Sequence, residues 1–328
     1  MEINQKTSPL VLISPFFFWG TAMVAMKGTI EQTTPLFMAS VRLLPAGLLI
    51  LAVAYWQQRP QPKSQKAWLW ITFFAIVDGA MFQGFLSQGL LRTGAGLGSV
   101  MIDSQPLAVA LLSSWLFGEI IGGLGFLGLA IGIAGISLIG LPESLITNLA
   151  QFNFSELSGL GTELFSGGEW LMLLAALSMA VGTVTIPFVC RYADPIMATG
   201  WHMIIGGMLL FLLSLSLETN QWQYLNVSDW LALSYATVFG SALSYGVFFY
   251  LAAAGNLTSL SSLTFLTPIF ALAFGNLFLA EVLTPLQWLG VSLTLVSIYV
   301  INQREKLTQK LSIFNQGFTR KVSRRYEN

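Results

Sequence analysis

The sequence predicts an all-α integral membrane protein with ten transmembrane helices, arranged as two inverted five-helix repeats with both termini in the cytoplasm. Three observations predict this class. Of the 328 residues, 55% are hydrophobic and only 9% are charged, whereas soluble domains carry about 25% charged residues. The mean hydropathy is +0.71. Two long stretches of the chain, 162 residues apart, also resemble each other.

Composition argues against enzymatic and metal chemistry. The single cysteine, Cys190, excludes an intramolecular disulfide and a multi-cysteine metal site. The single histidine, His202, makes an ordinary zinc site unfavourable. The sequence shows neither a glycine-rich phosphate loop nor a recognised nucleophile–base motif. We therefore expect no enzyme, no cofactor, no metal and no nucleic-acid partner; the expected partners are membrane lipids and a small-molecule substrate.

Ten apolar segments approach the length of about 20 residues that a helix needs to cross a bilayer. The predicted helices, numbered one to ten in chain order, are Leu10–Ile30, Pro35–Trp56, Ala67–Leu91, Ala95–Phe117, Ile120–Leu141, Glu169–Tyr192, Pro195–Leu217, Trp230–Ala254, Leu257–Leu279 and Leu283–Ile301. They are continuous apolar runs and not alternating ten-residue units, which excludes a β-barrel. The first is too long for a signal peptide, and its counterpart recurs mid-chain, so we expect it to be retained.

Lysine and arginine set the predicted orientation, because they accumulate in cytoplasmic loops. With ten crossings, one side collects Lys6, Arg59, Lys63, Lys66, Arg191 and seven basic residues after the last helix. The opposite side is acidic. Both termini are therefore expected in the cytoplasm. With no recognisable organelle presequence before the first helix, the compact chain fits a bacterial cell membrane.

The domain division follows from these segments. Residues 9–141 form the first predicted five-helix unit and residues 169–302 the second. Residues 142–168 form an acidic outer loop between them, and residues 303–328 form a basic cytoplasmic tail. The tail either rests on anionic lipid headgroups or is only a positive-inside signal.

The internal repeat is seen most clearly around the fourth and ninth helices. At an offset of 162 residues, Pro106 aligns with Pro268 and Glu119 with Glu281, without a gap. Gly20-Thr21 likewise aligns with Gly182-Thr183. Because each unit holds an odd number of helices, the second copy enters the membrane from the opposite side. Inverted repeats are characteristic of secondary transporters, whose substrate sites lie near the bilayer midplane.

The sequence also resembles the drug/metabolite transporter superfamily, and within it the EamA-type ten-helix permeases. The residues that show it are Trp19-Gly-Thr, Arg42, the run from Ser259 to Glu281, and Leu286 to Gly290. The resemblance covers roughly Pro9 to Asn302. It implies the ten-helix inverted-repeat fold and carrier-mediated movement of small metabolites, often export of amino acids or related compounds. The sequence departs from the family pattern at Asp103 and Gln105.

Three charged residues are expected near the middle of the membrane. Asp78 is placed about 16 Å and Asp103 about 12 Å deep, at about 1.5 Å per residue. A charge at this depth costs at least about 2.5–3.5 kcal/mol, so such acids face a cavity or a partner. Arg42 always keeps its charge. The acids are candidates for proton or substrate binding, and Arg42 for a substrate-carboxylate clamp. The alternative is a structural ion pair between Arg42 and either acid.

Further polar side chains are predicted to line the same path. His202 aligns with Arg42 and is either a hydrogen-bonded core residue or a titrating site. The other candidates are Trp19, Gln83, Gln105, Tyr245, Thr264 and Thr267. Each hydroxyl has the alternative of bonding its own helix backbone. Their clustering favours a lined cavity formed by the first, third, fourth, sixth, eighth and ninth helices.

Helix-breaking and small residues complete the predictions. Pro106 and Pro268 lie inside helices, remove a backbone donor and are predicted hinges of a rocking motion. The glycines of the fifth helix fit close helix packing, within the monomer or at a homodimer seam. The predicted function is a secondary transporter, expected to export small polar metabolites such as amino acids or organic anions by alternating access with proton coupling. The alternatives are an uncoupled permease and a non-transport structural or lipid-binding membrane protein.

Overall fold

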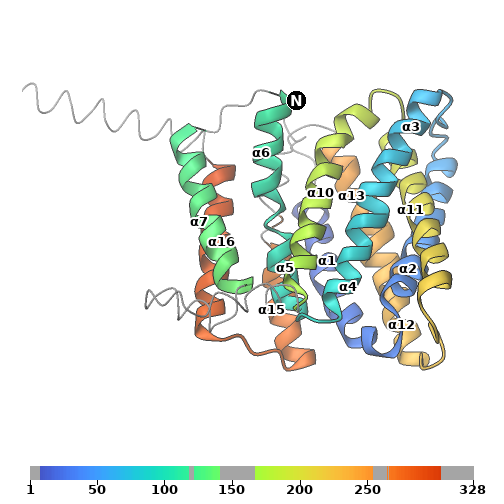
Figure 1. Cartoon of the computed structure of the whole chain (residues 1–328). Coiled ribbons are helices and arrows are strands. Elements are labelled where there is room, and N and C mark those ends of the chain that lie inside the picture. Colours follow the sequence, from blue (N-terminus) through green and yellow to red (C-terminus); the bar gives the residue numbers. More distant parts are fainter. Residues whose placement is uncertain (1–7, 118–121, 141–166, 254–263, 265, 304–328) are drawn as a thin grey trace, which may run out of the picture.

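The computed structural model describes residues 8–117, 122–140, 167–253, 264 and 266–303, and their regular secondary structure is helical (Figure 1). The first half contains α1 (Pro9–Thr29), η1 (Ile30–Gln32), α2 (Pro35–Trp56), α3 (Gln65–Phe74), η2 (Ala75–Phe82), α4 (Gln83–Leu90), α5 (Ala95–Ile102), α6 (Gln105–Phe117) and α7 (Gly122–Gly140). The second half contains α10 (Glu169–Val189), α11 (Pro195–Leu217), α12 (Val227–Tyr235), η4 (Ala236–Leu243), α13 (Ser244–Ala253), α15 (Leu266–Leu279) and α16 (Pro285–Asn302).

Among these residues, seven helical segments are long and apolar enough to cross a membrane. Three shorter apolar helices, Gly122–Gly135, Leu266–Leu279 and Pro285–Ile301, coincide with the predicted fifth, ninth and tenth spans. The prediction of a helical multi-pass membrane protein is thus confirmed, whereas ten crossings stay a prediction. The start of the predicted ninth helix, most of the outer loop and nearly all of the tail lie outside the described residues.

Local sequence explains where several helices begin. The bounds of α2 and α11 agree with the predicted spans, and both helices start at a proline, whose fixed φ and missing N–H suit the first helical position. Asp194 caps α11 by accepting from the backbone N–H groups of Ile196 and Met197. Thr284 forms a capping box with Gln287 at the start of α16.

Two predicted helices contain a π-helical segment in their middle. Between α3 and α4, η2 holds Asp78, and between α12 and α13, η4 occupies the corresponding place in the second half. The two segments begin 161 residues apart, at Ala75 and Ala236. A π-helical turn holds an extra residue and often occurs at functional sites. Hydropathy could not predict it, because its composition is that of the surrounding helix.

The predicted span Ala95–Phe117 corresponds to a candidate membrane span, Ala95–Leu116, but its helix is interrupted. The chain leaves α5 at Asp103, where φ is −72° and ψ is 3°, and α6 starts at Gln105. Pro106 is the second residue of α6, where its missing backbone N–H does not cost an intrahelical bond. The interruption lies in the turn before Pro106, which is the turn that a proline disrupts through the carbonyl group of residue i−4.

The helices are arranged around α1, which contacts α15, η4 and α5. The long pair α2 and α11 lies at one edge of the bundle, and the pair α7 and α16 at the other (Figure 1). In the latter pair, an added Cβ on Gly128 would lie 2.7 Å from Ile301. Gly132 and Gly135 approach Ser297 and Thr294 in the same way. These glycines therefore pack within the monomer.

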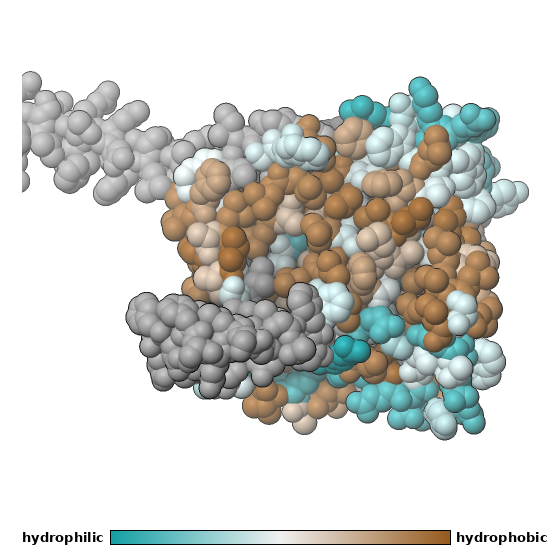
Figure 2. Space-filling view, in the orientation of Figure 1, coloured by the Kyte–Doolittle hydropathy of each residue, from teal (hydrophilic) through white to brown (hydrophobic). Residues whose placement is uncertain are grey.

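The outer surface is apolar across its middle. Figure 2 shows hydrophobic side chains over most of the visible face, with hydrophilic ones gathered toward its upper right and lower edges. Leucines such as Leu69 and Leu277 are about 70% exposed. A band of this kind on a helical protein is expected where lipid tails, and not water, contact the surface.

Candidate functional site

A central cavity of about 50 Å³ lies where both halves of the chain meet. This space is enough for a few water molecules. Its apolar wall comes from α1, η2, α4, α5, α10 and η4. The lining residues are Trp19, Ala22, Met23, Met26, Arg42, Phe82, Leu86, Ser99, Ile102, Asp103, Met179, Gly240, Tyr245 and Thr267.

Five of the lining side chains hold a buried polar atom that lacks a hydrogen-bond partner within the described residues. They are Trp19 Nε1, Arg42 Nε, Ser99 Oγ, Asp103 Oδ2 and Thr267 Oγ1. Buried polar atoms in proteins are almost always paired, and an unpaired group costs about 1–3 kcal/mol. One cavity that combines a guanidinium, a carboxyl group and three neutral donors, all incompletely bonded, is what a polar ligand site needs.

Arg42 is held by neutral groups. Its Nη2 donates to Gln83 Oε1, and Gln83 Nε2 in turn donates to the Tyr245 hydroxyl over 2.8 Å. Arg42 is 3% exposed and forms no ion pair within the described part of the chain. The predicted ion pair between Arg42 and Asp103 or Asp78 is therefore absent from this structure. The guanidinium keeps its charge without a protein carboxylate, so the site can accept an anionic group.

Asp103 lies at the end of α5, at the interruption before α6. Its side chain is 8% exposed, and Oδ2 points to no described donor. The helix break frees this position from the regular backbone and presents the carboxyl group to the cavity. Trp19 forms part of the opposite wall, with its ring 5.2 Å from that of Tyr245.

Asp78 and His202 form a separate buried pair. The Asp78 Oδ2 atom lies 3.3 Å from His202 Nε2, and the two side chains are 2% and 1% exposed. The His202 ring packs on Phe74 with centroids 4.3 Å apart. Gly182 leaves room for the acid, because an added Cβ there would lie 2.8 Å from Asp78 Oδ1. Neither partner lines the cavity, so the predicted role of Asp78 and His202 in substrate or proton binding stays a prediction.

The remaining predicted residues divide between the cavity and its surroundings. Gln105 donates to Thr183 Oγ1 over 2.7 Å and joins α6 to α10. Thr267 lines the cavity, and Thr264 is buried. Pro106 begins α6, and Pro268 is the third residue of α15. Gly20, next to Trp19, allows α1 to approach the Thr267 carbonyl oxygen closely.

Sequence reasoning missed the sulfur-rich wall. Met23, Met26 and Met179 line the cavity, but methionines in a membrane helix are usually packing residues. The signal that could have found the first two is their i, i+3 spacing on the helix that begins with the Trp19-Gly-Thr motif, which places them on Trp19's side of α1.

Comparison with known proteins identifies the family. The model of the EamA-like transporter family matches residues 7–141 and again residues 166–303. The chain belongs to this family. The resemblance inferred from Trp19-Gly-Thr, Arg42 and the run from Ser259 to Glu281 is thereby confirmed, and with it the expectation of a transporter and not an enzyme.

Named relatives agree with the family. An uncharacterized transporter of Synechocystis sp., sll0355, is 62% identical, with 95% of this chain and 96% of that protein covered. The WAT1-related protein At3g02690 of Arabidopsis thaliana, described as chloroplastic, is 54% identical over 89% of this chain and 68% of its own length. The inner membrane transporter YedA of Escherichia coli is 24% identical over 88% and 89%.

A solved structure supports the fold. A crystal structure with 16% sequence identity superposes with a TM-score of 0.64, covering 92% of this chain and 97% of its own. At that identity the likeness shows the fold alone. The EamA chain is therefore a multi-pass membrane protein that contacts lipid and a small-molecule substrate.

Proposed function

We propose that this EamA protein is a secondary transporter that moves small polar metabolites, such as amino acids or organic anions, by alternating access. The supporting observation is the central cavity, which holds Arg42 and Asp103 without an ion pair between them. Arg42 offers a fixed positive charge to a carboxylate or another anionic group. The apolar wall of Trp19, Met23 and Phe82 contacts the rest of the substrate.

Asp103 is proposed as the proton site. A carboxyl group in a closed apolar cavity favours its neutral form, and access to water on one side of the membrane favours ionisation. Alternating access would therefore couple loss and gain of one proton to the two open states. In a substrate with an ammonium group, the same carboxylate could bind that group, so that proton and substrate compete for one site.

The proposed architecture is ten transmembrane helices in two inverted five-helix units, residues 9–141 and 169–302, with both termini in the cytoplasm. Its support is the double match of one family model at 7–141 and 166–303. The hydrogen bond between Gln83 and Tyr245, which are 162 residues apart, falls on the same offset as the sequence repeat. The paired π-helices agree with it. The lysines and arginines support the orientation.

The direction of transport, the hinges and the membrane complete the proposal. Outward movement rests on the family resemblance. Pro106 and Pro268 act as hinges, since each lies at or near the start of a helix that flanks the cavity. A cell-membrane location is supported by the E. coli relative, which is described as an inner membrane transporter.

The test uses the purified full chain in liposomes that enclose a pH-sensitive dye. A panel of amino acids and organic acids is added outside, and proton movement is recorded for wild type, Asp103→Asn and Arg42→Gln. We expect one substrate class to drive proton flux in the wild type. Asp103→Asn should abolish proton flux, and Arg42→Gln should weaken substrate binding about tenfold to a hundredfold, the range for loss of hydrogen bonds to a charged group.

Asp229→Asn is the matched control, because Asp229 is also a buried carboxylate but serves in the capping box of α12. It should leave transport unchanged. Substrate movement without proton flux, unaffected by Asp103→Asn, would support the uncoupled permease instead. Absence of any substrate movement across the panel with folded protein would favour the non-transport alternative.

A further inference from the structure

A second hollow lies on the lipid-facing surface, away from the central cavity. Its volume is about 550 Å³, within the range of about 300–1,000 Å³ that ligand sites have. The walls come from α1, α2, α11, η4 and α13. Six of the apolar or aromatic wall residues are between 41% and 49% exposed: Val11, Leu49, Val53, Val238, Leu243 and Tyr250. We refer to this hollow as the α2–α13 groove.

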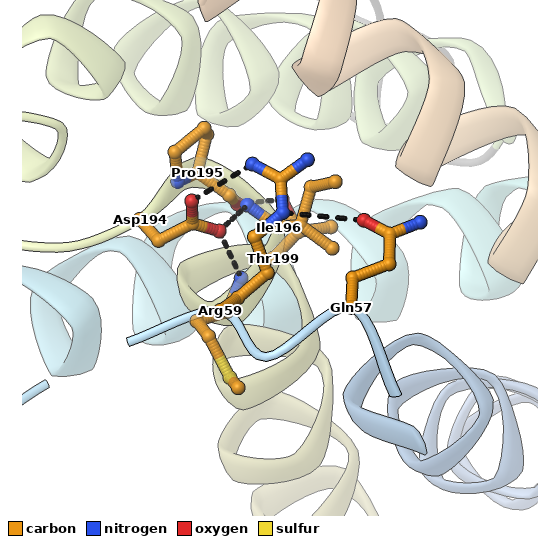
Figure 3. A network of polar contacts seen from close by, with 7 residues as sticks. Gln57, Arg59, Asp194, Pro195, Ile196 and Thr199 are labelled. Carbon is orange, nitrogen blue, oxygen red and sulfur yellow. Dashed lines mark hydrogen bonds and ion pairs between the residues drawn. The ribbon is translucent and has the colours of Figure 1, made fainter. Parts of the chain in front are cut away.

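One end of the α2–α13 groove is polar. Gln57 and Arg59, which follow the last turn of α2, form this end together with Tyr250. The Arg59 guanidinium lies 6.0 Å from the centre of the Tyr250 ring. Its Nη1 donates to Asp194 Oδ2 over 3.1 Å, and its Nε donates to Gln57 Oε1 over 3.2 Å (Figure 3).

The Arg59 network leaves donors unused. Figure 3 shows the Asp194 carboxylate between the guanidinium and the first turn of α11, where its other oxygen accepts from Ile196 and Met197. Asp194 thus fixes the guanidinium in position. The Nη2 group of Arg59 makes no hydrogen bond within the described part of the chain. A guanidinium held through Nε and Nη1, with the two N–H groups of Nη2 available, can donate to a phosphate.

The surroundings place Arg59 at the depth of lipid headgroups. Tyr55 and Trp56, in the last turn of α2, are 78% and 82% exposed. Trp68 and Trp201 pack together at the same end of the bundle, with centroids 5.1 Å apart. Exposed aromatic residues at a helix end mark the interface between hydrocarbon and headgroups. Below them the groove continues along the apolar surface.

We propose that the α2–α13 groove binds a bilayer phospholipid, with one acyl chain along the apolar wall and the phosphate on Arg59 Nη2. The charge of the phosphate complements the cation, and the apolar residues that line the rest of the groove suit a hydrocarbon tail. Basic pockets between transmembrane helices recognise lipid headgroups in this way. The site is separate from the central cavity, so it stands whether or not the proposed transport mechanism holds.

Gly246 offers a clean way to fill the groove. It lies on the groove wall in α13, and a Cβ built there would meet nothing within 4 Å. Gly246→Leu therefore adds bulk without a clash, and replacing a helical glycine should not weaken the helix. Gly123 in α7 also has nothing within 4 Å but lies outside the groove. Gly123→Leu is the matched control.

The experiment is native mass spectrometry of the purified full chain, titrated with phosphatidylglycerol or with diacylglycerol of the same acyl chains. We expect the wild type to retain one phosphatidylglycerol molecule in preference to diacylglycerol. Arg59→Gln should weaken phosphatidylglycerol binding about tenfold, the effect of losing a charge-assisted hydrogen bond, with diacylglycerol binding unchanged. Gly246→Leu should weaken both, and Gly123→Leu neither.

Equal binding of the two lipids by the wild type would overturn phosphate recognition at Arg59. Equal phosphatidylglycerol binding by wild type and Gly246→Leu would overturn the groove as the site. The single cysteine, Cys190, allows a thiol-reactive dye to report unfolding temperatures of all variants. If Arg59→Gln unfolds because Asp194 loses its partner, the comparison of Gly246→Leu with Gly123→Leu still decides the proposal.

Discussion

Two buried or part-buried carboxylates of this protein have opposite surroundings. Glu218, at the end of α11, accepts hydrogen bonds from the backbone of Leu36 and Phe37 at 2.9 and 3.0 Å. Hydroxyl groups of Thr34 and Ser214 add two more at 2.7 Å. Asp103, in the cavity wall, has an oxygen with no partner among the described residues.

The difference separates polar residues that hold the fold from those that can bind a ligand. Glu218 joins the end of α11 to the start of α2, where free N–H groups and the helix dipole favour an anion. Its hydrogen bonds are complete, so it has little left to offer a substrate. Asp103 and Arg42 cost stability as they stand. We expect such a cost where a ligand completes the bonding.

Replacing the cavity acid should give the largest functional effect. In Asp103→Asn, we expect proton-coupled transport to be lost, with at least a tenfold decrease in rate. The unfolding temperature should stay equal or rise, because a neutral amide costs less to bury than a carboxylate. Thermal unfolding monitored at Cys190 and dye-based transport in liposomes measure the two effects. A large drop in unfolding temperature would mean that Asp103 has a structural role.

Replacing Glu218, at the end of α11, should lower stability and leave transport unchanged. Glu218→Gln keeps the size of the side chain but loses the charge that four donors share. We expect a loss of about 2 kcal/mol in the free energy of unfolding, measured by reversible detergent denaturation. Transport per folded molecule should match the wild type. The distinction between the two carboxylates would fail if Glu218→Gln were stable and transport-deficient.

Two threonines provide a finer version of the same comparison. Thr34 Oγ1 donates to Glu218, whereas Thr267 Oγ1 faces the cavity unpartnered. Valine has nearly the shape of threonine, so Thr34→Val should cost about 1.5 kcal/mol, as for bonds to charged groups. Thr267→Val should change stability by less than about 0.5 kcal/mol and still slow transport severalfold. Equal stability losses for both would contradict the comparison.

The hydrogen bond between Gln83 and Tyr245, one of several that join the two halves, should contribute a modest coupling free energy. Gln83→Leu, Tyr245→Phe and the double variant form a cycle whose coupling free energy we expect at about 1 kcal/mol. The unfolding midpoint of each variant in detergent supplies the numbers. A coupling near zero would show that Arg42, and not Tyr245, fixes the position of Gln83.

The fold class could be predicted from the sequence because a membrane helix is recognised by the average hydropathy of about 20 consecutive residues. Continuous apolar runs determined α2 and α11 to the residue. The family was also recognised, from Trp19-Gly-Thr, Arg42 and the run from Ser259 to Glu281. A disturbance of the helix near Pro106 was predicted, but the full break at Asp103 and the two π-helices were not. They depend on single hydrogen bonds and side-chain packing, which composition does not reveal.

The sequence predicted several residues of the candidate site, but it did not predict which of the side chains pair with one another. Arg42, Asp103, Tyr245 and Thr267 were expected in one cavity and lie there. The pairing of Asp78 with His202 was not expected, because depth along a helix does not determine which face a side chain takes when a π-helical turn shifts the register. The three methionines that line the cavity were not predicted, because methionine in a membrane helix usually has only a packing role.

The hydrogen bond from Gln83 to Tyr245 has a consequence for how the chain evolved by duplication. Under the proposed duplication, the two positions are the same site in an ancestral unit, and an unmodified copy would carry identical side chains at both. An amide facing a phenol is no longer self-complementary. Once this site had diverged, two first halves could no longer form the contact that a first and a second half form. The contact between an amide and a phenol is therefore specific to a first half packed against a second half.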